Sequence, residues 1–303
     1  MCLIAFAFGL ADRGGPSLRL ASNRDEYFSR PTEQAHWWAD APDVFGGRDQ
    51  LAGGTWLAAS RRGRIAAITN HRNGLPAKAP RSRGTLVADF VQADEPIADY
   101  ACRIARQCAD YGGFNLILFE LAPMPHAWYV NDVGQARELA PGLYGISNDR
   151  LDTPWPKVER LKASLAQGLG RYLAGAAASA IAGSAGDASA DAAAGMAPDL
   201  APDERLFDAL LDRDVPPEHL LPESGVGISR ERYLSTAFIT PNGGTDVFGG
   251  YGTRASTLVE ARSDGRIRFT ERSWNTPGAP AAGYRERDER FGFRAAPAAG
   301  SGR

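Results

Sequence analysis

Segments with the composition of β-strands come in consecutive pairs along this chain, and short turns join the members of each pair. The clearest pair is formed by residues 2–10 and 17–25, which flank a turn sequence, DRGG, at residues 12–15. Strands joined in this way run antiparallel, because parallel strands need long crossover connections. We therefore expect antiparallel sheets with helices between the groups of strands, which is an α+β fold.

The spacing of apolar residues predicts the other elements. Further strands are expected at residues 55–60, 64–70, 114–120, 127–131, 235–240, 251–262 and 266–274. Two amphipathic helices, separated near Pro96, are expected within residues 85–108, and two more at residues 155–173 and 203–211. Strands such as residues 3–8 are apolar on both faces, which indicates a core of several layers.

Changes in composition divide the chain into one domain and two irregular segments. Residues 174–202 are almost entirely Ala, Gly, Ser and Asp, and such a segment buries too little apolar surface to offset its ordering entropy. We expect a disordered insertion there. After Asn275 the Ala, Pro, Gly and Arg content indicates a loose tail over residues 276–303. Residues 1–275 are then expected to form a single domain.

Charge, hydropathy and cysteine content exclude several classes of function. The net charge is −2 and no long basic run occurs, so nothing points to nucleic-acid binding. No apolar stretch approaches the ~20 residues of a membrane span. Three cysteines without a secretory leader favour the reducing cytoplasm, and the scattered histidines predict no metal site. The bias toward Ala, Arg and Asp is typical of a GC-rich bacterial genome.

Cys2 is the first candidate for chemistry. Removal of Met1 would make it the N-terminal residue, with a thiol beside its own α-amine. The reference pKa values of these groups, ~8.5 and ~7.7–8.0, allow the amine to act as general base for the thiol. The alternative is an ordinary buried strand residue.

The first hairpin brings this cysteine to a charged cluster, Asn23-Arg24-Asp25-Glu26. If the turn centres on Arg13, Cys2 faces Arg24; if it centres between Arg13 and Gly14, Cys2 faces Asp25. The first register also matches apolar residues across the pair and is slightly preferred. A guanidinium would favour the thiolate, and a carboxylate could hold the terminal ammonium.

Seven motifs, in order along the chain, resemble the NRDE family, also called the transport and Golgi organisation 2 family. They are Met1-Cys2-Leu3-Ile4, Asn23-Arg24-Asp25-Glu26, Gly54-Thr55-Trp56-Leu57, Thr69-Asn70-His71-Arg72, Ser82-Arg83-Gly84, Gly145-Ile146-Ser147-Asn148 and Tyr251-Gly252-Thr253-Arg254.

A weaker resemblance extends to the N-terminal-nucleophile hydrolases of the choloylglycine hydrolase and penicillin V acylase group. It implies a four-layer αββα sandwich with a terminal cysteine as nucleophile. Their site residues fall on Cys2 (nucleophile), Asp25 (near the amine), Asn70 (oxyanion hole), Asn148 and Arg254. Their early arginine, however, precedes the aspartate by three residues, a position held here by Ser22, whereas Arg24 adjoins Asp25.

The individual residues also admit ordinary structural roles. Asn70 ends a strand, where its amide could donate to an oxyanion or merely form a turn. Asn148 could equally cap a turn. Arg254 lies in an apolar strand and would need a carboxylate or an anionic ligand. His71 could be a base, a haem contact or simply a solvated loop residue.

Two functions follow as expectations. The first is an amide hydrolase or acyltransferase, in which Cys2 attacks a carbonyl while Arg24, Asp25, Asn70, Asn148 and Arg254 complete the catalytic site.

The second, implied by the family resemblance, is a non-catalytic carrier for haem or acyl-CoA. No cofactor is required in either case, and haem is a possible bound ligand. The residues expected to contact ligand are Asn23, Glu26, Trp56 and His71. An apolar pocket could be lined by Trp37, Trp38, Trp56 and Trp155.

Overall fold

The computed structural model describes residues 2–10, 16–74, 79–183, 203–241, 250–274 and 283–293, with only the main chain for residues 172–183. In this described part the strands form two antiparallel sheets. The first sheet has six strands in the order β10-β1-β2-β11-β12-β13, and the second has seven in the order β3-β4-β5-β6-β7-β8-β9. The expected α+β fold is therefore confirmed.

The strands and helices have the following bounds. The first sheet contains β1 (Cys2–Phe8), β2 (Pro16–Tyr27), β10 (Gly142–Ile146), β11 (Tyr251–Arg262), β12 (Arg266–Trp274) and β13 (Tyr284–Gly292). The second contains β3 (Thr32–Trp37), β4 (Val44–Asp49), β5 (Leu57–Ser60), β6 (Arg64–Asn70), β7 (Phe114–Glu120), β8 (His126–Asn131) and β9 (Ala136–Glu138). The helices are α1 (Gly84–Gln92), α2 (Ile97–Arg106), α3 (Pro156–Gly183), α4 (Glu204–Leu210) and α5 (Ile228–Tyr233).

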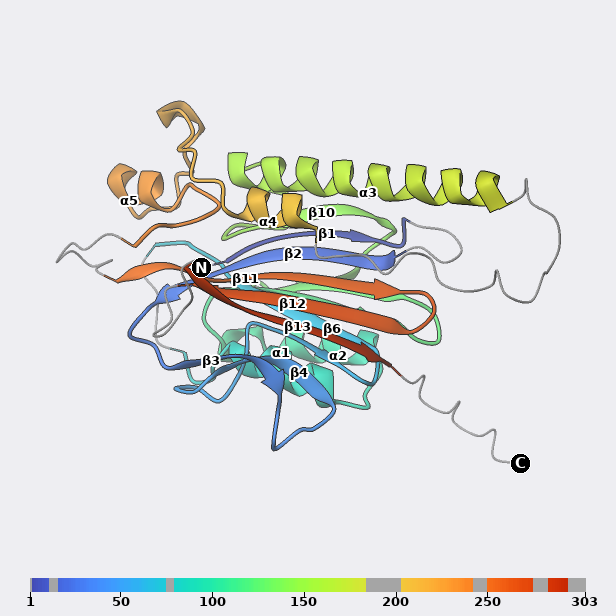
Figure 1. Cartoon of the computed structure of the whole chain (residues 1–303). Coiled ribbons are helices and arrows are strands. Elements are labelled where there is room, and N and C mark those ends of the chain that lie inside the picture. Colours follow the sequence, from blue (N-terminus) through green and yellow to red (C-terminus); the bar gives the residue numbers. More distant parts are fainter. Residues whose placement is uncertain are drawn as a thin grey trace.

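The helices cover the outer faces of the two sheets, which gives four layers (Figure 1). Helices α3 and α4 lie on the first sheet, where α3 contacts β1 and β10. Helices α1 and α2 lie on the second sheet, where α1 contacts β5 and β6 and α2 contacts β8. The order of layers is thus α, β, β, α, as expected.

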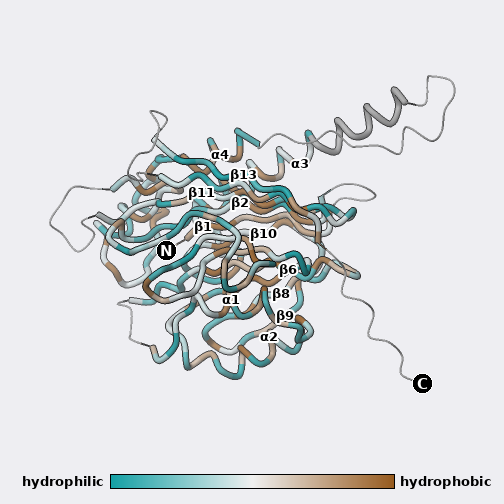
Figure 2. The backbone as a smooth tube through the Cα atoms, turned by 60° about the horizontal axis from the view of Figure 1, so that its bottom comes forward, coloured by the Kyte–Doolittle hydropathy of each residue, from teal (hydrophilic) through white to brown (hydrophobic). Residues whose placement is uncertain are grey.

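Strand alternation divides the buried residues of β1 between two apolar cores. Ile4, Phe6 and Phe8 point between the sheets, where Phe6 packs edge-on against Phe119 with ring centroids 5.2 Å apart. Leu3 and Ala5 point the other way, into the core beneath α3. Figure 2 shows hydrophobic stretches along the strands in the middle of the molecule. A strand buried on both sides explains the unbroken apolar run of residues 3–8.

The register of the first hairpin agrees with the preferred prediction. Cys2 pairs with Arg24, Phe6 with Leu20 and Phe8 with Leu18. The turn itself, residues 12–15, lies outside the described residues. The pairs β5–β6, β7–β8 and β11–β12 are also confirmed as antiparallel neighbours.

The strand expected at residues 235–240 is not formed. The main chain there bonds to side chains and loops: Ile239 N donates to Thr253 Oγ1 (2.8 Å), and Phe238 N donates to Asp212 O (2.8 Å). The carbonyl of Ala237 accepts from Asn23 Nδ2 (2.8 Å). Because these groups are satisfied elsewhere, the single main-chain bond to β11, from Thr253 N to Ile239 O (2.9 Å), does not extend into a ladder.

Two boundaries of the predicted irregular segments are also wrong. Helix α3 continues to Gly183, although disorder was expected from residue 174; residues 184–202 lie outside the described residues. Part of the expected tail forms β13, which pairs with β12 along its whole length. The remainder of the tail, residues 276–282 and 294–303, is not described. Among the described residues no helix is long and apolar enough to cross a membrane.

Candidate active site

The site lies where the first residue of β1 pairs with a residue near the end of β2. Cys2 lies directly opposite Arg24 in the antiparallel pair, so their side chains point to the same face. That face is the one that holds Ile4 and Leu20, between the two sheets. The alternation of β2 turns Asn23 to the opposite face, toward α4.

A pocket of about 220 Å³ opens at this point, where the first residue of β1 meets the second sheet. Six of the ten predicted site residues line it: Cys2, Arg24, Asp25, Glu26, Trp56 and Asn70. Residues distant in sequence complete its lining, among them Arg30, Asp49, the loop from Arg81 to Gly84, and Gly112. Polar groups dominate the pocket, and charged side chains are prominent among them.

Arg24 is held between the cysteine and an aromatic ring. Its guanidinium carbon lies 4.2 Å from the centre of the Trp56 ring, within the range of a cation–π contact. Its Nη2 is 3.9 Å from Glu26 Oε2, whereas Nη1 is buried and has no hydrogen-bond partner in the described part of the chain. Such a buried donor is expected to interact with a ligand or water, since leaving it unpaired is costly.

Glycines bring two of the recognised sequence motifs into contact beside this ring. A Cβ placed on Gly54 would lie 2.4 Å from the main-chain carbon of Gly84, and Thr55 N donates to Gly84 O (3.1 Å). A Cβ on Gly47 would lie 2.2 Å from the Trp56 ring. Only glycine permits these approaches, which place Trp56 and the loop before α1 at the pocket.

The end of β10 fixes both sides of the pocket. Ser147 Oγ donates to the Cys2 carbonyl (3.0 Å), and Asn148 Nδ2 donates to the Asn70 carbonyl (2.9 Å). Asn148 is fully buried, and its Oδ1 accepts from Ser147 Oγ (3.2 Å). The structure therefore places Asn148 behind Asn70, as a residue that positions it. Ser147 has the corresponding place behind Cys2 and was not predicted.

Burial dominates the acid–base properties of the two central groups. Burial raises the pKa of the Cys2 thiol, while the positive charge of Arg24 and a hydrogen bond from the Asp25 main chain act in the opposite direction. Burial also raises the pKa of the Asp25 carboxyl. Lys157 and a 2.7 Å hydrogen bond from Thr253 Oγ1 to Asp25 Oδ1 oppose that increase.

Lys157 was not among the predicted site residues and comes from the first turn of α3. It is buried, and its Nζ donates to the Leu234 carbonyl (2.8 Å). Burial lowers the pKa of this lysine to about 8, although the negative charges of Asp25 and Glu231 favour its protonated form.

Asn23 does not reach the pocket, contrary to its predicted role in ligand contact. Its Nδ2 donates to Leu210 O (2.7 Å) and Ala237 O (2.8 Å), and its Oδ1 accepts from Ser256 Oγ (2.6 Å). Asn23 is fully buried among these groups. Its side chain instead joins α4 and the segment around residue 237 to β2.

Arg254 likewise does not line the pocket. It lies at a β-bulge in β11, between Thr253 and Ala255, and a bulge redirects the side chain. Its Nη1 donates to three oxygens around the turn that follows β2, namely Tyr27 O (3.1 Å), Arg30 O (2.5 Å) and Thr32 Oγ1 (3.2 Å). These contacts supply the partners that an anionic ligand was expected to provide.

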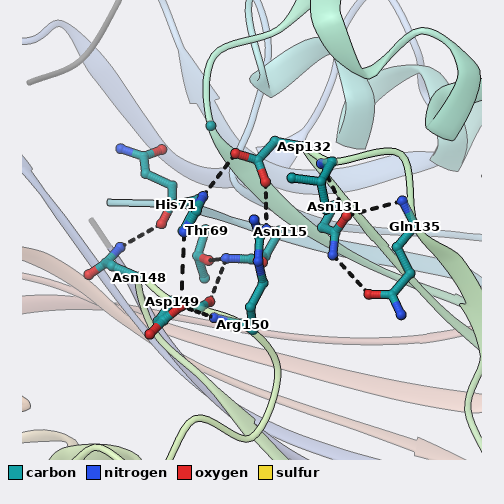
Figure 3. Close-up of polar contacts among 12 residues, drawn as sticks. Thr69, His71, Asn115, Asn131, Asp132, Gln135, Asn148, Asp149 and Arg150 are labelled. Atoms are coloured by element: carbon teal, nitrogen blue, oxygen red, sulfur yellow. Dashed lines mark hydrogen bonds and ion pairs between the residues drawn. The ribbon is translucent and has the colours of Figure 1, made fainter. Parts of the chain in front are cut away.

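His71 belongs to a separate polar cluster (Figure 3). Its Nδ1 lies 2.9 Å from Asp132 Oδ2, and its Nε2 lies 3.9 Å from Asp149 Oδ1. Arg150 Nη1 donates to the other oxygen of Asp132 (2.5 Å). The histidine is thus engaged by two aspartates and does not line the pocket around Cys2.

The predicted pocket of four tryptophans is not assembled. Trp38 is buried and donates from Nε1 to Gly46 O (2.9 Å), and Trp37 packs edge-on against Phe45 and Phe291. Trp155 packs against the guanidinium of Arg72 (5.0 Å). Only Trp56 of the four lines the pocket that contains Cys2.

Comparisons with known proteins cover nearly the whole chain. A family model described as Transport and Golgi organisation 2 matches residues 1–276. The human Transport and Golgi organization protein 2 homolog is 30% identical over 282 residues, which are 90% of this chain and 93% of the human one. The bovine homolog is 31% identical with the same coverage. These animal relatives give no support to a bacterial source.

Two solved structures resemble this chain weakly. An N-acylethanolamine-hydrolyzing acid amidase ortholog from Caenorhabditis elegans has a TM-score of 0.37 at 10% identity, covering 79% of this chain and all of its own. A C2A mutant of the conjugated bile acid hydrolase from Clostridium perfringens has a TM-score of 0.40 at 9% identity, covering 98% of this chain and 97% of its own.

The family assignment rests on the sequence matches, which agree with the resemblance found in the seven motifs. The chain belongs to the Transport and Golgi organisation 2 family.

Proposed function

We propose that this protein is a cysteine amidohydrolase or acyltransferase whose nucleophile is Cys2, exposed as the N-terminal residue after Met1 is removed. The observation that carries the proposal is the pairing of Cys2 with Arg24 at the wall of a polar pocket. A thiol, a cation and an amide side chain, Asn70, border the same space. This is the set of groups that acyl transfer requires.

The reaction would proceed in two steps. The α-amine of Cys2 takes the thiol proton, and the sulfur attacks the carbonyl carbon of the amide. The carbon–nitrogen bond breaks, the departing amine takes a proton from the α-ammonium, and the acyl group remains on sulfur as a thioester. Water then attacks the thioester, giving a carboxylic acid and restoring the thiol; another amine in place of water gives acyl transfer.

Charged and polar neighbours would support these steps. Arg24 opposes the effect of burial on the pKa of the thiol and so favours the thiolate. Asn70 would donate its amide N–H to the developing oxyanion, a contribution of about 3 kcal/mol in comparable sites. Asn148 and Ser147 would hold Asn70 and Cys2 through their carbonyls. Asp25 would help to place the α-amine.

Intact mass spectrometry followed by alkylation tests this proposal. We expect the purified protein to have lost Met1, and iodoacetamide to modify Cys2 quickly at neutral pH. Peptide mapping separates Cys2 from Cys102, an exposed thiol that serves as the internal reference. A Cys2→Ser variant should lose the rapid modification and keep that of Cys102.

Retention of Met1 would overturn the mechanism, because the α-amine would then be part of a peptide bond. Loss of Met1 with a Cys2 that reacts more slowly than Cys102 over pH 7–9 would also contradict it. In that case the amine would not be activating the thiol.

A second candidate function is a carrier for acyl-CoA or haem without turnover. The arginines at the pocket favour it, since they suit the phosphates of CoA or the propionates of haem. Because Trp56 packs on Arg24, a bound ligand should change tryptophan fluorescence. Titration with palmitoyl-CoA and with haem tests this function, and an unchanged signal with both would remove it.

A further inference from the structure

Four arginines line the pocket that contains Cys2, and they differ in how their charge is balanced. The guanidinium of Arg30 is bound to Asp49 through two nitrogens, with Nη2 2.6 Å from Asp49 Oδ2. This pair is neutral as a whole. The remaining three arginines, Arg24, Arg81 and Arg83, are not matched in this way.

Arg24 is the most buried of the three. It is 5% exposed, its Nη1 has no hydrogen-bond partner among the described residues, and Glu26 lies 3.9 Å from Nη2. The pocket is the space that this side chain borders. A guanidinium N–H without a partner, on a side chain that lines a pocket, is suited to donate to an anionic oxygen.

Arg81 and Arg83 line the same pocket from the loop that leads into α1. Arg83 Nη1 donates to the Gly113 carbonyl (3.0 Å), and the Arg81 guanidinium lies over the Tyr111 ring at 4.9 Å. Within the residues that the structure describes, neither has a carboxylate within ion-pair distance. Burial lowers the pKa of Arg83, although the negative charge of Glu26 acts in the opposite direction.

Another arginine-rich hollow differs from the loop that carries Arg81 and Arg83, because all of its arginines have ion-pair partners. It lies where β11, β12 and β13 end, and it is lined by Arg262, Arg266, Arg268 and Arg290. There every arginine has an acidic neighbour: Glu260 or Asp264 for Arg262, Asp264 for Arg266, and Asp288 for Arg268 and Arg290.

We propose that the pocket binds an anionic group of the substrate, a carboxylate or a phosphate, between Arg24 and the Arg81–Arg83 loop. This inference rests on the proposed function and narrows its substrate class to acidic amides, in which the anionic group enters the pocket with the scissile bond. Guanidinium groups bind both anions through paired hydrogen bonds, so one arrangement serves either.

Charge-selective alkylation tests this proposal without any turnover. Iodoacetate and iodoacetamide modify thiols by the same chemistry and differ in charge. We expect the iodoacetate-to-iodoacetamide rate ratio at Cys2 to exceed that at Cys102 by about tenfold at low salt, because a cationic cleft concentrates anions. The excess should shrink as salt is added.

Single-residue variants assign the effect to the loop. Arg83→Gln should lower the ratio at Cys2 roughly three- to fourfold, the effect of one unit charge several ångström away at an intermediate dielectric constant. Arg81→Gln, at an exposed position, gives a second test if Arg83→Gln does not fold. Arg137→Gln, on the exposed edge strand β9, is the matched control and should leave the ratio unchanged.

Protection experiments identify the anion. N-acetylglycine should slow the reaction of Cys2 with iodoacetamide, while N-acetylglycinamide, which lacks the negative charge, should not. Protection by inorganic phosphate as well would assign a general anion site, and protection by N-acetylglycine alone would assign a carboxylate site.

Equal rate ratios at Cys2 and Cys102, with no protection by either anion, would overturn the proposal. This result would leave the hydrolase proposal standing, because that depends on Met1 loss and on a reactive Cys2. Conversely, charge selectivity at an unactivated Cys2 would keep the anion site and remove the hydrolase.

Discussion

Asn148 Nδ2 donates a 2.9 Å hydrogen bond to the main-chain carbonyl of Asn70. Both residues were expected in the catalytic site, but the first holds the second in place. Asn70 borders the pocket, whereas Asn148 is fully buried behind it. Asn148 can therefore affect the pocket only through the residues that it holds, such as Asn70.

We expect Asn148→Ala to lower the free energy of unfolding by about 1–3 kcal/mol, because the Asn70 carbonyl and the Ser147 hydroxyl each lose a partner. Urea denaturation measures this change. Asn73→Ala, at an exposed asparagine, is the control and should stay within about 0.5 kcal/mol of the unmodified protein. Equal stabilities of the two variants would contradict the role given to Asn148.

Replacement of Arg24 by glutamine should make Cys2 less reactive at neutral pH. The arginine charge lowers the pKa of the thiol against the effect of burial, so its loss raises that pKa. We expect the midpoint of the alkylation rate against pH to move up by about one unit. Arg137→Gln should leave the midpoint in place, and a midpoint that does not move in Arg24→Gln would show that Arg24 does not act on the sulfur.

Lys157 should make the stability of the protein depend on pH in an identifiable way. Its pKa is lowered to about 8 in the folded protein, from 10.5, so between these values the unfolded chain binds more protons. The contribution of Lys157 to the free energy of unfolding therefore rises from pH 8 to pH 10.5, by at most about 3 kcal/mol. Any stability advantage of Lys157→Met should shrink over this range.

Urea denaturation of both proteins at several pH values measures this effect. Lys162→Met is the matched control, since an ion pair with Asp152 raises the pKa of Lys162 although partial burial opposes it. Its difference from the unmodified protein should stay constant from pH 8 to pH 10. A constant difference for Lys157→Met would show that Lys157 remains protonated throughout.

Gly54→Ala should destabilise the protein by about 1–3 kcal/mol, because the added Cβ would lie 2.4 Å from the main chain of Gly84. Gly170→Ala is the matched control: no atom lies within 4 Å of a Cβ at this position in α3. That variant should gain about 0.5–1 kcal/mol from the lower entropy of the unfolded chain. Thermal unfolding of both variants measures these two changes in stability, which should have opposite signs. Two changes of the same sign would refute the close contact between Gly54 and Gly84.

Apolar periodicity predicted most of the elements that fill the two cores, but it missed β4 and β10, which contribute Val44, Phe45 and Ile146. Strands such as β1 and β7 are buried along most of their length, so their sequences are almost entirely apolar. Strand β13 was missed because its sequence, YRERDERFG, is dominated by charges. Ion pairs with β12 hold this strand, such as Arg268 with Asp288 and Arg272 with Glu286. The sequence of one strand alone does not reveal such pairs.

The candidate site was predictable where it depends on one hairpin. Counting residues across the β1–β2 turn placed Cys2 opposite Arg24, and the same alternation turns Asn23 away from the pocket. The loop containing Arg81 and Arg83 and the clamp by Ser147 could not be predicted in this way. They reach the pocket through packing between the two sheets, which no local pattern in the chain encodes.

The bond from Ser147 to the carbonyl of Cys2 has a practical consequence for anyone preparing this protein. It ties the first residue of β1 to the residue that follows β10, beside the pocket that Cys2 lines. An affinity tag or fusion partner joined ahead of Cys2 would keep the α-amine of Cys2 in a peptide bond, unless it were removed. Recombinant protein intended for assays should therefore carry its tag at the C-terminus.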